Sequence, residues 1–449
     1  MLGKEFLFDL GEQIIRTGRA EGIEVVIFSE LTNLTRYANS TIHQNLTLKH
    51  LRIGVRVREG KRAAIAWSNR YDKDSVIELV RNAKEQLKNS PEDLYLPPLL
   101  EKREVKEVKG GFSERTISVT AKERAERVMK VIKGSKPYKA FGTFTTGGVE
   151  FVFVNSRGHR AYHRATDAHL TVNFMSDTGS GWAQASAIDV EDIDFENVKE
   201  KALQKMKLSE NPIELPPDTY TVILEELAVT ILLEFMGWMG FSAKSYQEGR
   251  SFLIGKLGQK IFDEKITLVD DPFYSGGFSL PFDMEGVPKK KLTLIEKGIP
   301  QNLVYDRKTA LKDNVESTGH SMSPFGNFPY PLNMVLFPGE KSLDELIRET
   351  ERGLLVTRLH YTNVVEPLSL TLTGMTRDGT FLIENGKVVK GIKNLRFTES
   401  IVEALKDVEV GSPSQLIGET SWYEMRFPAG IITPPLKISK FTFTGKTEF

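Results

Sequence analysis

The sequence contains no cysteine. This absence excludes disulfide bonds, thiolate metal ligands and cysteine nucleophiles. Net charge is absent as well, since 60 Lys and Arg residues balance 60 Asp and Glu residues. A protein that holds nucleic acid by neutralising phosphates needs a positive field, so the sequence predicts no direct contact with nucleic acid.

Long apolar runs are also missing. Nowhere do about 18 apolar residues follow one another, which is the length of a membrane-spanning helix. Lys4, Glu5, Asp9 and Glu12 interrupt the first apolar runs before a signal-peptide core could form. We therefore expect a cytoplasmic protein that does not enter a membrane. Its 449 residues exceed what one core usually holds, which predicts two or three domains.

Two similar α/β units are predicted before the C-terminal half. A hairpin, a Trp-bearing strand and a helix follow one another around Trp67 and again around Trp182. The hairpin loops are too short for parallel crossovers, so the strands of both units are expected to pair antiparallel. Proline-rich stretches at 88–111 and 211–218 read as linkers that separate the units from each other and from the rest.

The helices of these units carry start signals. A helix from about Lys73 has Ser75 placed three residues before Glu78, and this spacing predicts a capping box. The same spacing recurs at Thr120 and Glu123, ahead of a second helix with apolar residues at helical periodicity.

Short strands with Gly and Pro punctuation dominate the rest of the chain. Their density favours a curved or barrel-like β domain. Ser342 and Glu345 predict a capped helix over 342–352. The block 353–400 is richest in hairpins, and Asn385-Gly386 supplies the positive φ angles of a tight turn. We predict an α+β protein with duplicated N-terminal α/β units and a large β-rich, barrel-like C-terminal domain. The predicted domains are 1–111, 112–216 and 217–449.

The amino-acid sequence of this block resembles that of the TldD/PmbA family. The phrases TGMTRDGTFLIENGK and NLRFTES, both within 353–400, are specific to that family. The resemblance covers essentially the full length, most specifically from Ser279 onward and more loosely before Gly111. It implies participation in a cytoplasmic peptidase system that acts on small polypeptides.

The segment Leu233-Glu234-Phe235-Met236-Gly237-Trp238 distinguishes the member types. In the catalytic members of that family, this helix carries His-Glu-x-x-x-His, whose imidazoles bind zinc. Here Glu234 and Gly237 match, but Leu233 and Trp238 stand at the histidine positions, and neither side chain offers a lone pair to zinc. The family's third ligand, a cysteine near the C-terminus, has no counterpart. The resemblance implies a PmbA/TldE-like subunit without a metal or cofactor, paired with a TldD-like zinc subunit or with itself.

Four residues are candidates for substrate binding. His320 lies in a loop of small residues and is either near a substrate or simply a polar loop residue. Strand alternation is expected to place Arg358 and His360 on one face and Tyr361 on the other. Arg358 could bind a peptide carboxylate with its two-pronged guanidinium, or these residues could simply tie the β domain together. Glu234 has no confident catalytic role once the metal ligands are missing.

The remaining titratable groups receive structural interpretations. His159 and His163 lie four residues apart on a predicted strand, roughly 13 Å, which is too far for one metal ion. We therefore expect these two and His169 to be solvent-facing. Asp283 and Glu285 lie in the segment PFDMEGVP and could form a general base or a cation site. We expect them instead to lie in a solvated turn.

Two other functions stay open. The chain could be a metallopeptidase with unorthodox ligands, such as His320 or His360. It could also be a regulatory protein that acts on DNA gyrase through protein contacts, as the family's historical label suggests. Exposed edges of a β-rich domain need covering, so we expect a two-fold related or homologous partner.

Overall fold

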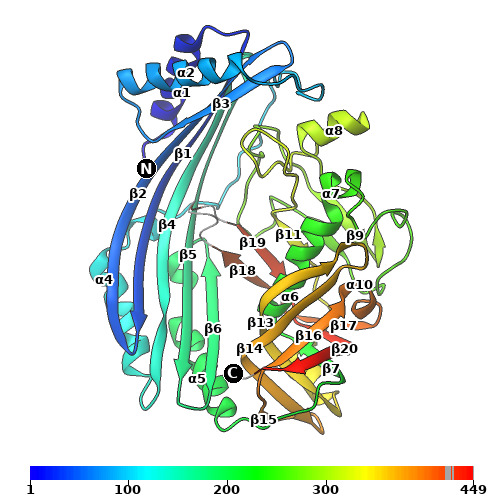
Figure 1. Ribbon diagram of the computed structural model, residues 1–449. Helices are drawn as coiled ribbons and strands as arrows, with labels where there is room; N and C mark the ends of the chain where they lie inside the picture. The colour runs from blue at the N-terminus through cyan, green and yellow to red at the C-terminus, as the bar shows by residue number, and fades with distance from the viewer. Residues whose placement is uncertain (420–425, 427–428, 448–449) are drawn as a thin grey trace.

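A computed structural model describes residues 1–419, 426 and 429–447. Its N-terminal part is built on one six-stranded antiparallel sheet in the order β3-β2-β1-β4-β5-β6 (Figure 1). The strands are β1 Gly22–Ala38, β2 Thr41–Glu59, β3 Arg62–Ser68, β4 Lys139–Asn155, β5 Arg160–Met175 and β6 Ser180–Ala187. The two predicted units therefore share a sheet, which β1 and β4 join along their lengths.

Four helices cover one face of this sheet, here called the outer face. They are α1 Lys4–Gly18, α2 Lys73–Lys88, α4 Ala121–Lys133 and α5 Phe195–Ser209. The first two pack at one end of the strands against residues such as Val25 and Ile27, and the other two pack at the opposite end against Tyr37 and Phe144. Successive strand residues point to opposite faces, so Glu24, Val26 and Phe28 face the C-terminal domain on the inner face.

Helix α2 begins at Lys73 as predicted, but its predicted capping box is wrong. The residue that caps α2 is Asp72, whose side chain accepts the N–H of Ser75 at 3.1 Å. Asp72 directly precedes the first helical residue, so Ser75 already lies within the helix and cannot form the predicted capping box with Glu78.

The two other predicted capping boxes are confirmed, Thr120 with Glu123 and Ser342 with Glu345. The helix after Ser342 is shorter than predicted, however. It is α9 Leu343–Arg348, because Arg352 already begins a long strand of the C-terminal domain.

The C-terminal domain contains a closed β-barrel, which confirms the predicted barrel-like architecture. Its ring runs β7-β13-β14-β16-β20 and closes through antiparallel pairing of β20 with β7. The strands are β7 Thr219–Leu224, β13 Arg352–Glu366, β14 Thr371–Glu384, β16 Leu395–Ser400 and β20 Leu436–Lys446. The predicted Asn385-Gly386 turn joins β14 to β15 Lys387–Gly391, with φ angles of 49° and 74°.

A second sheet lies beside the barrel. Its order is β10-β9-β8-β11-β19-β18. The strands are β8 Leu268–Asp270, β9 Leu292–Glu296, β10 Ile299–Pro300, β11 Met334–Leu336, β18 Gln415–Glu419 and β19 Ala429–Thr433, and β12 Lys341–Ser342 and β17 Val408–Ser412 extend the barrel sheet. The shorter helices are α3 Glu114–Ser118, α7 Ala243–Gln247, α8 Arg307–Asp313 and α10 Ile401–Ala404. Helix α6 Glu226–Met236 packs in the core between the barrel and this sheet.

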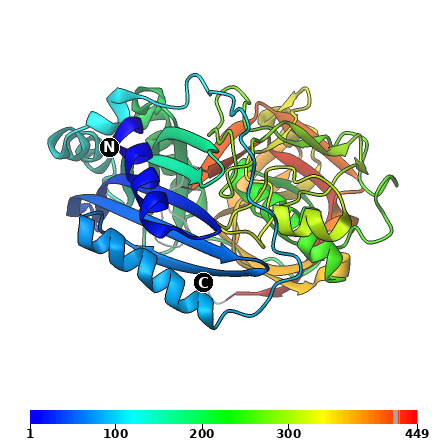
Figure 2. The ribbon, with the colours of Figure 1, turned by 90° about the horizontal axis from the view of Figure 1, so that it is seen from above.

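The inner face of the N-terminal sheet packs directly on the C-terminal domain (Figure 2). Phe28 and Phe151 stack with ring centroids 4.7 Å apart, and Phe282 of the C-terminal domain stacks on Phe151 at 5.0 Å. In the described part of the chain, no helix has both the length and the apolar character needed to cross a membrane. The division into 1–111, 112–216 and 217–449 stays a prediction.

Candidate functional site

The helix that carries the degenerate metal motif ends in an unusual way. Helix α6 runs to Met236 and continues as a π-helical turn over Gly237–Phe241. In an α-helix of 3.6 residues per turn, two side chains five positions apart diverge by about 140° around the axis. A π-helical turn, with hydrogen bonds from i to i+5, reduces that divergence. Leu233 lies in the regular α-helix, whereas Trp238 lies in this π-helical turn.

The two substituted positions lie in different environments. Leu233 is only 3% exposed and belongs to the main core of the C-terminal domain, whereas Trp238 is 44% exposed. The Trp238 ring lies 6.0 Å from that of Phe235, so an aromatic surface borders the end of the helix. A Cβ on Gly237 would lie 3.1 to 3.2 Å from Pro331, Met334 and Tyr330. Close packing therefore accounts for this glycine without any chemistry.

Zinc does not fit the residues of this helix. Glu234 is half-buried, and its carboxylate is the one potential ligand in the segment 233–238. Across residues 1–419, 426 and 429–447, no group of three or more His, Asp or Glu side chains is placed to hold a metal ion. The helix can therefore contribute packing and an aromatic surface, and no step through a metal follows from its residues.

Arg358 binds partners within the protein. Its guanidinium forms an ion pair with Asp378, and it lies 4.4 Å above the ring of Trp182. Asp378 also accepts a hydrogen bond from Ser180 Oγ at 2.8 Å. Trp182 and Ser180 belong to β6, so Arg358 and Asp378 connect the barrel to the N-terminal sheet. A substrate carboxylate would have to compete with Asp378, and the substrate role of Arg358 stays a prediction.

The strand alternation expected around Tyr361 is interrupted. The register of β13 against β14 shifts between His360 and Asn363, and Tyr361 has a φ of 52°. Such a left-handed backbone is rare for a bulky residue and signals local strain. Tyr361 is 74% exposed, with its ring 4.9 Å from that of His360. Burial, with Arg377 and Arg358 nearby, lowers the pKa of His360.

His320 is buried against a carboxylate. Its Nε2 lies 3.0 Å from Asp270 Oδ1, and its Nδ1 lies 2.9 Å from Thr318 Oγ1. Lys289 Nζ is 3.5 Å from the same Asp270 oxygen. Although burial opposes ionisation, Lys289 and His320 hold the pKa of Asp270 well below its usual range. Both ring nitrogens of His320 are therefore engaged inside the protein, and its substrate role stays a prediction that requires this loop to open.

The expectation that three histidines face solvent is wrong for two of them. His159 is completely buried, with Nε2 2.8 Å from Gly286 O, and His163 is 7% exposed, with Nε2 2.8 Å from Ser279 O. Both carbonyls belong to the C-terminal domain, which covers the inner face of the sheet at this point. Burial lowers the pKa of His163 to about 4. His169 is half-buried and pairs with Ser186 Oγ at 2.8 Å.

The solvated turn expected at Asp283 and Glu285 is also wrong. Each residue is only 1% exposed, because the segment inserts between the N-terminal sheet and the C-terminal domain. Asp283 accepts the N–H groups of Glu285, Val287 and Ser321 at 2.9 Å each. Burial raises the pKa of both carboxyl groups.

A buried ion network joins this segment to the sheet. Arg307 Nη1 donates to Glu24 Oε1 at 3.0 Å, and the Arg307 backbone N–H donates to Glu285 Oε2 at 3.0 Å. Arg56 pairs with the other oxygen of Glu24. Burial opposes the charge of Glu24, but Arg56 and Arg307 lower its pKa. We call Glu24, Arg56, Asp283, Glu285 and Arg307 the interface cluster.

Sequence reasoning missed most of this cluster. Glu24 lies in GIEVVIF and Arg56 in RIGVRVR, so each charge interrupts an apolar strand. A charge within an apolar strand is a signal of a buried, paired group. Arg307 carries no such signal, because it lies at the start of the short helix α8.

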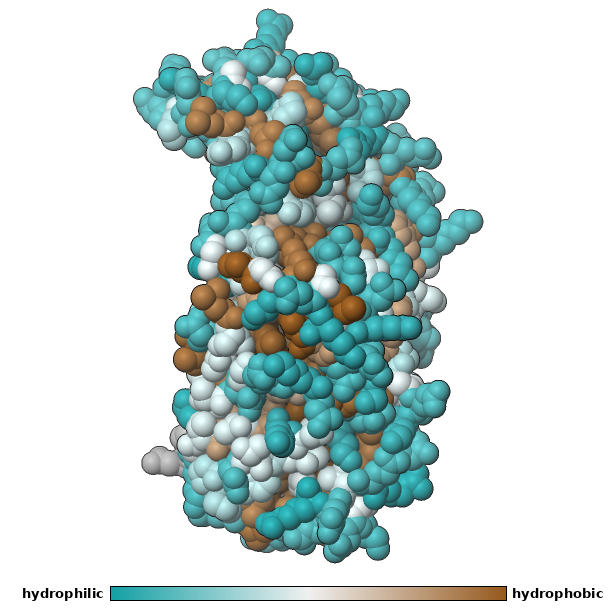
Figure 3. Space-filling view, turned by 90° about the vertical axis from the view of Figure 1, so that its right-hand side faces the viewer, coloured by the Kyte–Doolittle hydropathy of each residue, from teal (hydrophilic) through white to brown (hydrophobic). Residues whose placement is uncertain are grey.

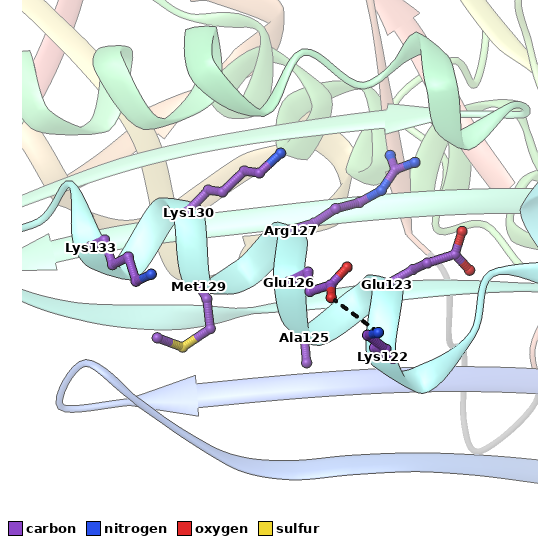
Figure 4. A pocket seen from close by; sticks show the side chains of 8 residues that line it. All are labelled: Lys122, Glu123, Ala125, Glu126, Arg127, Met129, Lys130 and Lys133. Carbon is purple, nitrogen blue, oxygen red and sulfur yellow. Dashed lines mark ion pairs between the residues drawn. The ribbon is translucent and has the colours of Figure 1, made fainter.

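A surface hollow along α4 does not form a site. It measures about 640 Å³ and is lined by eight residues that all belong to α4 (Figure 4). Their side chains fan out from one helix instead of converging on a point, and Lys122 pairs with Glu126 at 3.9 Å. A solvated helix face explains it.

Comparison with known proteins agrees with the resemblance found in the sequence. A family model for the PmbA/TldA metallopeptidase C-terminal domain matches residues 217–445. A protein from Methanothermobacter thermautotrophicus named metalloprotease is 29% identical over 303 residues, which are 64% of this chain and 65% of that protein. The chain thus spans less than two thirds of that relative.

Two crystal structures share the fold. TldE from Thermococcus kodakarensis matches with a TM-score of 0.87 and 23% identity, over 97% of this chain and 100% of that one. A candidate modulator of a DNA gyrase from Thermotoga maritima matches with a TM-score of 0.83 and 18% identity, over 98% and 100%. At these identities the likeness shows the fold alone. Because the family model covers just over half of the 449 residues, the chain belongs to the TldD/PmbA family.

Proposed function

We propose that this chain is the non-metallated, PmbA/TldE-like subunit of a cytoplasmic TldD/PmbA peptidase system that acts on small polypeptides. In this role it supports a homologous TldD-like subunit, which holds the zinc ion. The chain helps to shape the substrate chamber and docks its partner, and it binds no metal or cofactor itself.

One observation carries this proposal. At the two positions where the catalytic motif of the family needs imidazoles, the chain has a core leucine, Leu233 of α6, and a partly exposed tryptophan, Trp238 of the following π-helical turn. Leu233 packs among apolar residues, so a ligand at its position would also have to be accommodated in that core.

Exposed apolar surface supports a partner. Figure 3 shows apolar side chains along one face of the molecule, interspersed with hydrophilic ones. Partly exposed apolar residues of the C-terminal domain include Trp238, Ile254, Leu311 and Val315. Exposed apolar side chains such as these are available for contact with a partner protein. The likeness to the fold of TldE is consistent with the proposed subunit type.

The first test is metal content together with peptide hydrolysis. The purified chain, a purified TldD-like homologue with an intact His-Glu-x-x-x-His motif, and their mixture are each analysed for zinc and assayed on an unfolded peptide. We expect less than about 0.1 zinc per chain here, because a zinc site needs three or four ligands. Hydrolysis is expected to require the homologue and to increase when this chain is added.

Two outcomes would overturn the proposal. Stoichiometric zinc with chelator-sensitive hydrolysis by this chain alone would make it a metallopeptidase with unorthodox ligands. His320→Ala and His360→Ala would then show which imidazole is needed. A second contrary outcome is failure of the chain to associate with the TldD-like homologue in light scattering at micromolar concentration, with no change in the activity of that homologue.

A further inference from the structure

We propose that the open edge of β2, residues Thr41–Arg52, binds an extended, acidic polypeptide segment as an added strand. The inference goes beyond the proposed function, because it concerns binding by this chain alone. It requires neither zinc nor a partner subunit.

The two edges of the N-terminal sheet are treated differently. At one edge, the C-terminal domain covers β6, where Gly418 N–H donates to Ser186 Oγ at 3.2 Å. At the other edge, β3 pairs only with Ile53–Glu59 of β2. Among the residues that the structure describes, no strand pairs with Thr41–Arg52 on that side. An unpaired edge offers backbone groups to an incoming strand.

The direction of the backbone groups can be traced along β1. Ile23 N–H donates to Ser156 Oγ at 3.1 Å, and Ile23 O accepts the N–H of Ser156 at 2.9 Å. Ile23 therefore directs both backbone groups towards the β4 side. Successive residues of a strand alternate in this respect. No register shift interrupts β1 before Arg36, so Leu31 and Asn33 also direct their groups towards β4.

The residues opposite them on β2 point the other way, to the open edge. Opposite residues of an antiparallel pair either exchange both hydrogen bonds or direct both sets of groups away from each other. Lys49 lies opposite Leu31, and Thr47 lies opposite Asn33. The N–H and C=O groups of Thr47 and Lys49 therefore face the open edge, where an added strand would pair with them.

The charge of this edge selects the occupant. No Asp or Glu occurs from Thr41 to Arg58, whereas Lys49, opposite Leu31 on the outer face, is cationic and exposed. Carboxylates on the outer face of an added strand would meet Lys49. A second copy of the same edge would bring like charges together, which disfavours self-pairing. Leu48 is 44% exposed on the inner face and offers an apolar contact beside the charges.

The test uses fluorescent ten-residue peptides of alternating Glu and Val, with an alternating Lys and Val peptide as the charge control. Binding to the intact chain is measured by fluorescence anisotropy. We expect the acidic peptide to bind about tenfold or more tightly than the basic one and to weaken as salt is raised. The matched variants are Lys49→Ala, which removes the charge, and Lys49→Pro, which also removes the outward N–H. Lys49→Pro is expected to bind about tenfold more weakly than Lys49→Ala.

A second measurement guards against a misfolded variant. Two acidic peptides, each N-methylated at one of the two alternate sets of positions, are titrated into the unmodified chain. The peptide methylated at the N–H groups that face β2 is expected to lose binding. The proposal is overturned if the methylated and unmethylated peptides bind equally, or if a folded Lys49→Pro binds as Lys49→Ala does. It is also overturned if the chain alone forms a dimer that Lys49→Pro dissociates, since the occupant is then a second copy.

Discussion

Helix α6 and the interface cluster differ in where they place polar and apolar side chains. The family's chemistry needs polar ligands on α6, yet Leu233 there is a core residue and Trp238 an aromatic surface. The densest buried charges instead lie between the sheet and the C-terminal domain, around Glu24 and Arg307. Buried titratable groups are often taken as markers of active sites, but structural ion networks produce them too. In this chain, they mark the junction of the two parts of the fold.

The strongest test of this contrast is Arg307→Met. Methionine keeps most of the apolar part of the side chain but removes the guanidinium that donates to Glu24 Oε1 at 3.0 Å. Because a buried carboxylate then loses a partner, the free energy of unfolding should fall by about 3–5 kcal/mol. Urea unfolding followed by circular dichroism measures the change.

Arg81→Met is the matched control. Arg81 is 61% exposed and pairs with Glu78 at 3.7 Å on the surface of α2. Surface pairs contribute little, so a change within about 0.5 kcal/mol is expected. If the two variants lost similar free energy, the interface cluster would not hold the two parts together as argued.

A pH series sharpens the same contrast at His163. Burial lowers its pKa from the ordinary 6.5 to about 4, so the folded protein disfavours the charged imidazole. The contribution of His163 is complete above about pH 6.5 and is lost as the pH falls towards 4, by at most about 3 kcal/mol. His163→Gln removes the titration, so its stability should decline less between pH 6.5 and 4 than that of the unmodified chain. Parallel declines in the two proteins would contradict this account.

Local sequence patterns predicted much of the fold. The capping boxes at Thr120 and Ser342 and the Asn385-Gly386 turn depend on neighbouring residues only, and the structure confirms them. The density of short strands likewise predicted the barrel, whose ring closes through β20 and β7. Such features are decided by nearby backbone groups and by periodicity, which a sequence displays directly.

The errors share a different cause. His159, His163, Asp283 and Glu285 were expected to face solvent, but all four are buried. The two histidines are covered by Gly286 and Ser279, more than a hundred residues away in the chain, and the two carboxylates by the packing of the C-terminal domain on the sheet. Burial of a polar strand or turn residue depends on which distant segment covers it, and local patterns carry no information on that. The π-helical turn after α6 was also missed. The spacing of apolar residues in an α-helix does not show where the helix takes up one extra residue in a turn.

Leu233→His asks whether α6 could readily regain a ligand. Leu233 is 3% exposed among apolar core residues, so an imidazole there would lose packing and gain no evident partner. The free energy of unfolding should fall by about 2–3 kcal/mol. Leu233→Met keeps the apolar volume and should cost less than about 1.5 kcal/mol. Thermal unfolding measures the stability of both variants. If Leu233→His were as stable as the unmodified chain, position 233 would tolerate a polar ligand and would not be a strict core position.

Trp238→His is the smallest change expected on α6. The side chain is 44% exposed, so replacing it should alter the free energy of unfolding by less than about 1 kcal/mol. The variant offers one imidazole beside Glu234, whereas protein zinc sites use three or four ligands. Equilibrium dialysis should therefore show no stoichiometric zinc at micromolar metal. Tight zinc binding by this variant would mean that further ligands lie within reach of the π-helical turn, and α6 would then be a dormant metal site.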